Sequence, residues 1–493
     1  MSAAPLSASR CQLLVELAAL AVLAAVSARL FAPGDAWSLA GGLAVAYAVP
    51  RAAYTTRSWC TTAGRWVLTT MGLAMCALAV LTVWECTVAA GLTTETPLLI
   101  ADDGNYFRWA LHHYDGRCAE PRVAFPGFPM LMLWSWRVLG VSVVWPIALN
   151  VLLTLLAVVM TAATTRRLLA GVTRQSDGWH ATAALCMTAV LAYFLSQGLR
   201  VQKEAMVYLS ITCIGYALAG MNNRHGGAER QPWRDAVLWA GGCLMLALAR
   251  TTYLYFALIG LAVVGLPRFR HHWRTLLAAL ALAAPAIALG NHLASYSVEG
   301  HLDIVRGGYY MQKAFLSGTT QQPYLDLIGD YFMQPVWRRL AILPLACCVQ
   351  FVIPFPWVYT SPTVLTVLPR LAWGWYAVGG MVLFYYLMQF TRGGRRLGIG
   401  AWAWWPAAIY VIIAYVVAGT VHRYVLPVEL LGVPLAVTVL ARLREGEWRR
   451  AFRRWALAYV LALATTLVVC HHIQTTYLQQ LDDYYRRVVK LHE

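Results

Sequence analysis

The chain has 493 residues, of which 60% are hydrophobic and only 12% are charged, whereas soluble domains carry roughly 25% charged residues. This composition excludes a soluble globular domain and predicts a protein that crosses the membrane several times. The formal net charge of +17 does not indicate nucleic-acid binding, because the basic residues form short clusters between apolar segments instead of one stripe.

The apolar segments give the expected spans. The segments long enough to cross a hydrocarbon core of about 30 Å lie at 12–31, 66–92, 143–164, 178–196, 205–221, 275–293, 369–390, 399–418, 425–441 and 455–470. Shorter candidates lie at 36–50, 236–249 and 252–266. The segment at 12–31 is interpreted as a span and not as a secretory signal, because Arg29 lies near its end without a small-residue cleavage site.

The basic connections predict the orientation. By the positive-inside rule, the cytoplasmic connections are 51–65, 166–174, 224–234, 268–274, 392–396 and 442–454. Segments 93–142, 197–204, 294–368 and 419–424 then lie on the opposite side, provided that 340–357 does not fully cross. We therefore expect an all-α polytopic bundle of about 11–13 transmembrane helices whose outer loops carry short interfacial helices.

A single integral membrane domain is expected over 1–493, because no repeat or hinge linker interrupts the chain. Its predicted parts are an N-terminal helical hairpin at 1–65, a core at 66–293, a large outer loop at 294–368, and C-terminal helices with an outer tail at 369–493. The first outer loop, 93–142, belongs to the core.

Two adjacent carboxylates, Asp102 and Asp103, begin the stretch "DDGNYFRWALHHY". A central Asp in a span costs about 2.5–3.5 kcal/mol even on a translocon scale, so both are predicted at a water-facing rim. Tyr106 recurs with Ala110 and Tyr114 at helical spacing, which indicates a short interfacial helix. Capping of that helix is the structural alternative for the two carboxylates.

The stretch "FPGFPMLMLWSWRVLG" follows, and its Pro126 and Pro129 interrupt the chain before an apolar run. Together, "DDGNYFRWA" and "FPGFPMLMLWSWRVLG" resemble the first outer loop of the GT-C superfamily of membrane glycosyltransferases. The resemblance is greatest to the branch of the protein O-mannosyltransferases and lipid A aminoarabinose transferases. "GLRVQKEAMVYL", "LMLALARTTYLYFALIGL" and "HRYVLPVELL" resemble further segments of that family, so the resemblance covers about 66–442.

The resemblance implies a GT-C-like core and transfer of a sugar from a polyprenyl-phosphate carrier to a lipid, glycan or protein acceptor, with inversion at the anomeric carbon. It implies Asp102 as the general base, while Asp103 orients the acceptor, binds a cation or pairs with an arginine. Tyr106, Pro126 and Pro129 then belong to the acceptor or structural loop. Cationic side chains on the outer side are the candidates for binding the donor phosphate: Arg200, Lys203, Arg250, Arg306, His422 and Arg423.

No cofactor is expected to be required. A divalent cation would draw on Asp102 and Asp103, but the outer acids are otherwise scattered, so a metal is not favoured. Beside the donor and acceptor, membrane lipids are the expected partners and nucleic acid is not. The protein is expected in the plasma membrane, with its site facing the outside or the periplasm.

Two other functions are compatible with the composition. A secondary transporter would use charges within apolar segments, such as Glu16, Glu85 and Arg250, along a substrate path. The chain shows no internal repeat, which counts against that class. An O-antigen ligase or polymerase also has many spans and a large outer loop, but the early "DDGNYF" followed by "FPGFP" favours the GT-C interpretation.

Overall fold

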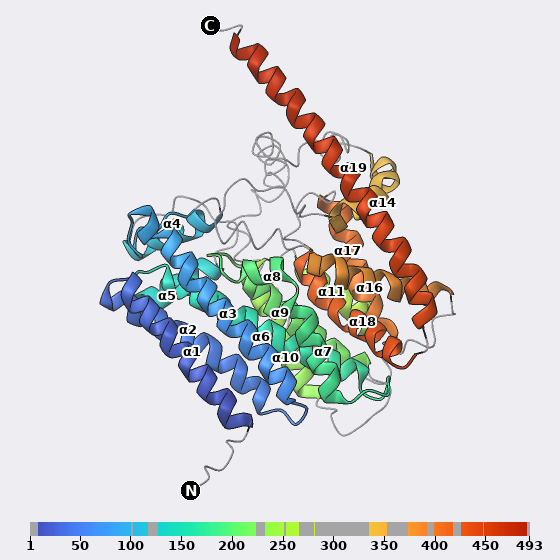
Figure 1. Cartoon of the computed structure of the whole chain (residues 1–493), viewed down its shortest axis with the longest axis horizontal. Coiled ribbons are helices and arrows are strands. Elements are labelled where there is room, and N and C mark those ends of the chain that lie inside the picture. Colours follow the sequence, from blue (N-terminus) through green and yellow to red (C-terminus); the bar gives the residue numbers. More distant parts are fainter. Residues whose placement is uncertain are drawn as a thin grey trace.

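The computed structural model describes residues 8–99, 102–116, 127–222, 232–250, 253–265, 281, 335–352, 373–391, 399–417, 425–446 and 448–490. All regular secondary structure in these residues is helical (Figure 1). The predicted all-α class is therefore confirmed for the described part of the chain.

The N-terminal half contains α1 (Ala8–Leu30), α2 (Pro33–Thr55), α3 (Thr62–Cys86), the 3-10 turn η1 (Val88–Ala90), α4 (Asp102–Tyr114), α5 (Gly127–Leu139), α6 (Val144–Leu169), α7 (Asp177–Ala189), α8 (Ala192–Gln197) and α9 (Glu204–Asn222). The C-terminal half contains α10 (Pro232–Ala249), α11 (Leu254–Gly260), the π-helix η3 (Leu261–Gly265), α14 (Val336–Val352), α16 (Trp373–Thr391), the 3-10 turn η7 (Gly400–Ala403), α17 (Trp404–Val417), α18 (Leu426–Arg444) and α19 (Arg449–Lys490).

Six helices among the described residues are long and apolar enough to cross a membrane: Arg10–Leu30, Thr62–Ala90, Val144–Leu169, Glu204–Asn222, Leu426–Arg444 and Arg449–His472. Shorter apolar helices lie at Leu254–Gly265 and Gly400–Tyr415. The protein is thus an integral membrane protein with several spans, as its composition predicts. The short candidate at 36–50 lies within α2, whose 23 residues reach about 35 Å at 1.5 Å per residue.

The predicted span at 178–196 is not one helix. It divides into α7 and α8, and the break falls at Val190 and Leu191. Gly374 of α16 packs against this break so closely that an added Cβ would lie 1.7 Å from the carbonyl oxygen of Val190. A tertiary contact 184 residues away in the sequence thus accompanies the end of α7, and no local pattern announces it.

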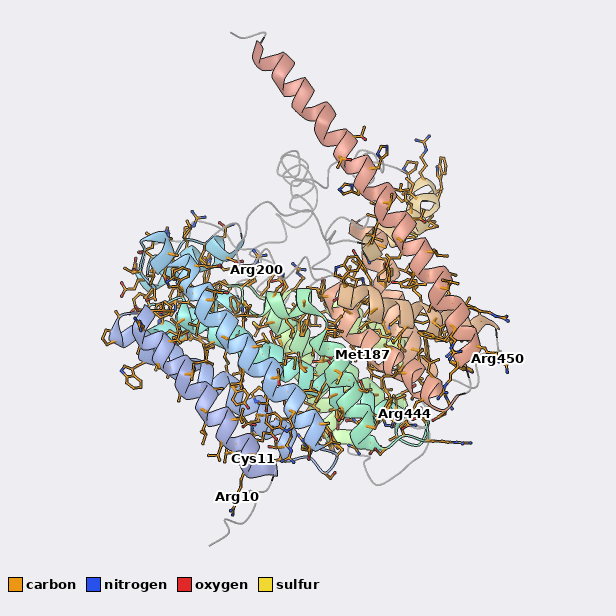
Figure 2. All side chains as sticks on the ribbon, viewed as in Figure 1. Arg10, Cys11, Met187, Arg200, Arg444 and Arg450 are labelled. Atoms are coloured by element: carbon orange, nitrogen blue, oxygen red, sulfur yellow. The ribbon has the colours of Figure 1, made fainter. Side chains whose placement is uncertain are left out.

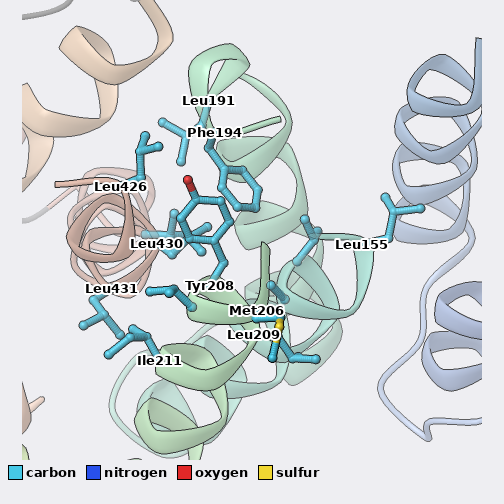
Figure 3. Close-up of a cluster of buried hydrophobic side chains, with 14 of the residues drawn as sticks. Leu155, Leu191, Phe194, Met206, Tyr208, Leu209, Ile211, Leu426, Leu430 and Leu431 are labelled. Atoms are coloured by element: carbon cyan, nitrogen blue, oxygen red, sulfur yellow. The ribbon is translucent and has the colours of Figure 1, made fainter. Parts of the chain in front are cut away.

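The core is centred on α6 and α9, which pack against each other and against α2, α7, α10 and α18. Figure 3 shows one part of this core, where α8, α9 and the beginning of α18 meet. There the rings of Phe194 and Tyr208 pack edge to face at 5.0 Å, beside Leu426 and Leu430. This packing fixes the beginnings of α9 and α18 relative to each other.

Labelled arginines mark the two ends of the bundle in Figure 2. Arg10, Arg444 and Arg450 lie at one, which we call the basic end, and Arg200 lies at the other, which we call the site end. The connections 442–454 and 197–204, predicted to lie on opposite sides of the membrane, therefore do lie at opposite ends of the bundle.

Glu16, a carboxylate within an apolar segment, serves helix packing. It is 2% exposed, pairs with Arg51 of α2 and accepts a hydrogen bond from Thr69 of α3 at 2.9 Å. Tyr47 and Gln12 donate to the same Thr69 hydroxyl. These contacts connect α1, α2 and α3, so the charge of Glu16 needs no substrate path to account for it.

Candidate active site

The helix α4 lies across the site end and buries one face. Tyr106, Phe107 and Ala110 are buried on that face, whereas Tyr114 is exposed. The predicted interfacial helix is therefore present, and its rings pack on α5: Tyr106 contacts Phe128 at 6.4 Å between ring centroids, and Phe107 contacts Trp136 at 4.9 Å. Asp102 is the first residue of this helix, and its side chain lies outside the description.

Asp103 points into the protein and is 4% exposed. Its carboxylate accepts a hydrogen bond from the Gln202 amide and one from Arg200 Nε at 3.3 Å. Burial raises the pKa of Asp103, against the opposing effect of the Arg200 guanidinium and the Gln202 amide. Three roles were predicted for Asp103: to orient the acceptor, to bind a cation or to pair with an arginine. The contact with Arg200 has the geometry of the third, an ion pair.

The loop 198–203, between α8 and α9, supplies both partners of Asp103. The amide of Asn150 on α6 donates to the carbonyl oxygens of Arg200 and Gln202, at 2.5 and 2.8 Å. At the beginning of the loop, a Cβ on Gly198 would lie 2.5 Å from the hydroxyl oxygen of Thr154. A glycine is needed for this close approach, and Asn150 then holds the loop in place.

Lys203 and Glu204 follow in the same segment, and both are 4% exposed. The Lys203 ammonium lies 5.5 Å from the centre of the Tyr106 ring, a cation–π contact that connects the loop to α4. Glu204 begins α9, where the positive end of the helix dipole favours a carboxylate.

Arg250 extends the cluster from the end of α10. Its Nη2 lies 3.6 Å from Glu204 Oε1, and its Nη1 donates to the Tyr253 hydroxyl at 3.2 Å. The guanidinium also lies over the Tyr253 ring at 5.1 Å. The two side chains of the ion pair are only 9% and 5% exposed. The fold thus joins Arg250 to the segment that carries Arg200 and Lys203.

The motif "FPGFP" places α5 against α10. A Cβ on Gly127 would lie 2.3 Å from the carbonyl oxygen of Leu248, so only glycine allows this approach. Pro129 is buried in the first turn of α5. The contact falls two residues before Arg250, so this motif positions α5 beside the charged cluster.

Several predicted site residues lie outside the described residues: Pro126, Arg306, His422 and Arg423. Of the described ones, Asp103, Arg200, Lys203 and Arg250 belong to one cluster, with Tyr106 against it. The sequence patterns did not single out Gln202, Asn150, Tyr253 or Glu204 as site residues. The signal available for Glu204 was its place at the beginning of an apolar helix, directly after Lys203.

The cluster holds three cations and two carboxylates among the described residues: Arg200, Lys203, Arg250, Asp103 and Glu204. Within this cluster, Arg200 is the most accessible of the ion-paired side chains, at 30% exposure against 6% for Asp103. Within the described part of the chain, no three His, Cys, Asp or Glu side chains converge as metal ligands would. Chemically, the cluster offers fixed cationic donors at a partly buried surface.

An apolar cavity of about 570 Å³ lies among α14, α16, α17, α18 and α19. Cys348, Trp375, Tyr410, Gly432 and Tyr459 line it, one from each helix. Its volume is that of a small-molecule or acyl-chain pocket. Part of its wall, α14, comes from the loop 294–368.

No family model matches the sequence, and no curated protein matches it. The structure is similar to the crystal structure of ArnT from Cupriavidus metallidurans bound to undecaprenyl phosphate. The identity is 13% and the TM-score is 0.47, over 80% of this chain. The chain spans only 63% of the length of that ArnT structure. ArnT is a lipid A aminoarabinose transferase of the GT-C superfamily.

Proposed function

We propose that the protein is a GT-C-type membrane glycosyltransferase that moves a sugar from a polyprenyl-phosphate carrier to an acceptor hydroxyl. The supporting observation is the charged cluster at the site end, formed by the segment 200–204 and Arg250 against the helix that begins at Asp102. The departing phosphate needs stabilisation, and fixed cations in a site of low dielectric provide it better than water does.

We assign the general base to Asp102. Asp103 is buried and engaged by Arg200 and Gln202, so its part in the proposal is to position the Arg200 guanidinium. A carboxylate that removes the proton of the attacking hydroxyl contributes typically 10²–10⁴ in rate. Attack on the face opposite the departing phosphate inverts the anomeric carbon.

Donor binding is assigned to the cations of the site end. Arg200 keeps part of its side chain accessible while it contacts Asp103, as a phosphate ligand requires. Lys203 and Arg250 add positive charge within the cluster, and Arg306, His422 and Arg423 stay predicted ligands. The proposed mechanism needs no metal ion.

The carrier is a long isoprenoid, and we assign its apolar chain to the cavity beside α14. The cavity is lined by apolar and aromatic side chains of five helices, including α18 and α19. By the positive-inside rule the basic end faces the cytoplasm, so the proposed chemistry takes place on the outer or periplasmic face.

The test uses purified protein in detergent with a panel of polyprenyl-phosphate and polyprenyl-diphosphate sugars and several acceptors. Carrier release is followed by mass spectrometry, with and without a chelator. Asp102→Asn is the test variant, and Asp115→Asn is the matched control, because Asp115 is an exposed carboxylate just beyond the other end of α4.

Wild type and Asp115→Asn should release carrier from at least one donor, and a folded Asp102→Asn protein should be slower by at least about 10². The chelator should leave the rate unchanged. Equal rates for Asp102→Asn and wild type would refute the base assignment. If no donor is turned over with any acceptor, the proposed function fails and transport assays in liposomes take its place.

A further inference from the structure

A second cavity, of about 410 Å³, lies between α7 and α18, away from the charged cluster. Ala183, Cys186 and Met187 line it from α7, and Leu440 and Leu443 line it from α18. Cys186 is exposed, so the cavity is an open groove on the surface of the bundle. In Figure 2, Met187 lies above Arg444, which is at the basic end.

The side chain of Arg444 lies at one end of this groove. Arg444 lines the cavity, is exposed, and its guanidinium lies 5.6 Å from the centre of the Trp179 ring. Two neighbouring arginines are neutralised: Arg166 pairs with Asp177 at 2.9 Å, and Arg442 pairs with Glu445 at 3.0 Å. In the described part of the chain, no carboxylate lies within 4.0 Å of the Arg444 guanidinium.

The groove has a direction across the membrane. The helix α7 begins at the basic end with Asp177, and α18 ends there with Arg444. From Trp179 to Met187, α7 rises about 12 Å at 1.5 Å per residue. The groove therefore runs from a cation and an aromatic ring at the rim to apolar side chains at greater depth.

We propose that this groove binds an anionic phospholipid of the cytoplasmic leaflet, with its phosphate at Arg444 and one acyl chain along Ala183, Cys186 and Met187. The groove is open at the surface of the bundle alongside α18, which is one of the helices long and apolar enough to cross a membrane, so it faces lipid. An indole ring is typical of the headgroup level, and basic pockets between helices on the cytoplasmic side bind anionic headgroups. The inference rests on the orientation of the basic end and not on the proposed glycosyl transfer.

The test is native mass spectrometry of the purified full chain, delipidated and then mixed with phosphatidylglycerol or phosphatidylcholine of the same acyl chains. Arg444→Ala removes the cation and Arg444→Lys keeps a charge. Cys186→Trp fills the groove with the arginine intact. Arg450→Ala is the matched control, because Arg450 is also exposed at the basic end (Figure 2) but does not line the groove.

Wild type should bind phosphatidylglycerol more tightly than phosphatidylcholine, and Arg444→Ala should weaken phosphatidylglycerol binding about fivefold. Arg444→Lys should retain most of the affinity, and Arg450→Ala should equal wild type. Cys186→Trp should weaken both lipids. A photoreactive acyl chain on phosphatidylglycerol should crosslink to the α7 peptide that contains Met187.

The proposal is overturned if wild type binds the two lipids equally, or if Arg444→Ala and Arg450→Ala lower binding to the same extent. A crosslink that avoids α7 would overturn it as well. Should Arg444→Ala fail to fold, the comparison of lipids on wild type and the Cys186→Trp variant decide the question without it.

Discussion

Removal of Arg250 alone should destabilise the protein more than removal of Arg250 together with its partner Glu204. At 3.6 Å and an effective dielectric constant of about 20, the attraction is roughly 4–5 kcal/mol, and the desolvation of two buried ions costs a similar amount. The net contribution of the pair is therefore small. Loss of Arg250 leaves the buried Glu204 carboxyl group without its cation, which costs about 3–5 kcal/mol.

The structure also predicts an order among the variants. In Arg250→Met, the buried Glu204 loses its cation, and its Oε2 has no hydrogen-bond partner among the described residues. In Glu204→Gln, Arg250 still contacts the ring and hydroxyl of Tyr253, so the loss should be smaller. The double variant, which combines Arg250→Met with Glu204→Gln, should be more stable than Arg250→Met alone.

The assay is unfolding by titration with SDS, followed by tryptophan fluorescence, with the exposed Arg450→Met as a control that should match wild type. A double variant whose loss equals the sum of the two single losses would refute the reasoning, because the two charges would then act independently.

Three further perturbations test the packing and electrostatics of the site end. Because burial raises the folded-state pKa of Asp103 above its ordinary 3.8, the contribution of Asp103 to stability should fall as the pH rises from 3.8 through that folded-state pKa. The difference in melting temperature between wild type and Asp103→Asn should therefore change across that window, and a constant difference would contradict the shift. Gly127→Ala would bring a Cβ to 2.3 Å from the Leu248 carbonyl and should cost about 1–3 kcal/mol on SDS unfolding. The control Gly41→Ala, with no atom within 4 Å, should be neutral or stabilising by about 0.5–1 kcal/mol. Asn150→Ala deprives two loop carbonyls of their donor and should cost about 1–3 kcal/mol, together with slower transfer; wild-type values for both would remove its positioning role.

Much of the fold was predictable, because long apolar runs in a chain with few charges have few alternatives to membrane helices. The helix α2 and the interfacial helix α4 follow from local pattern in the same way. The break between α7 and α8 was not predictable, because its partner, Gly374, lies far along the chain. Local periodicity carries no information on such a contact.

In the candidate site, too, some features were predictable from the sequence and others were not. Charged residues stand out in an apolar chain, so Asp103, Arg200, Lys203 and Arg250 could be selected without a structure. Their pairing could not, because Arg250 and its partner Glu204 are brought together only by the packing of α9 and α10. Uncharged amides such as that of Asn150 give no signal of this kind, although its two hydrogen bonds hold the loop.

The length of α19 has a consequence for access to the site end. Its 42 residues extend about 63 Å at 1.5 Å per residue, roughly twice the thickness of a hydrocarbon core of about 30 Å. Because α19 begins at the basic end, its last turns project past the bundle at the opposite end, as Figure 1 shows. These last turns of α19 project on the same side of the bundle as the charged cluster. In the proposed transfer, a bulky acceptor that approaches through water would meet these turns on one flank, whereas an acceptor anchored in lipid would pass beneath them.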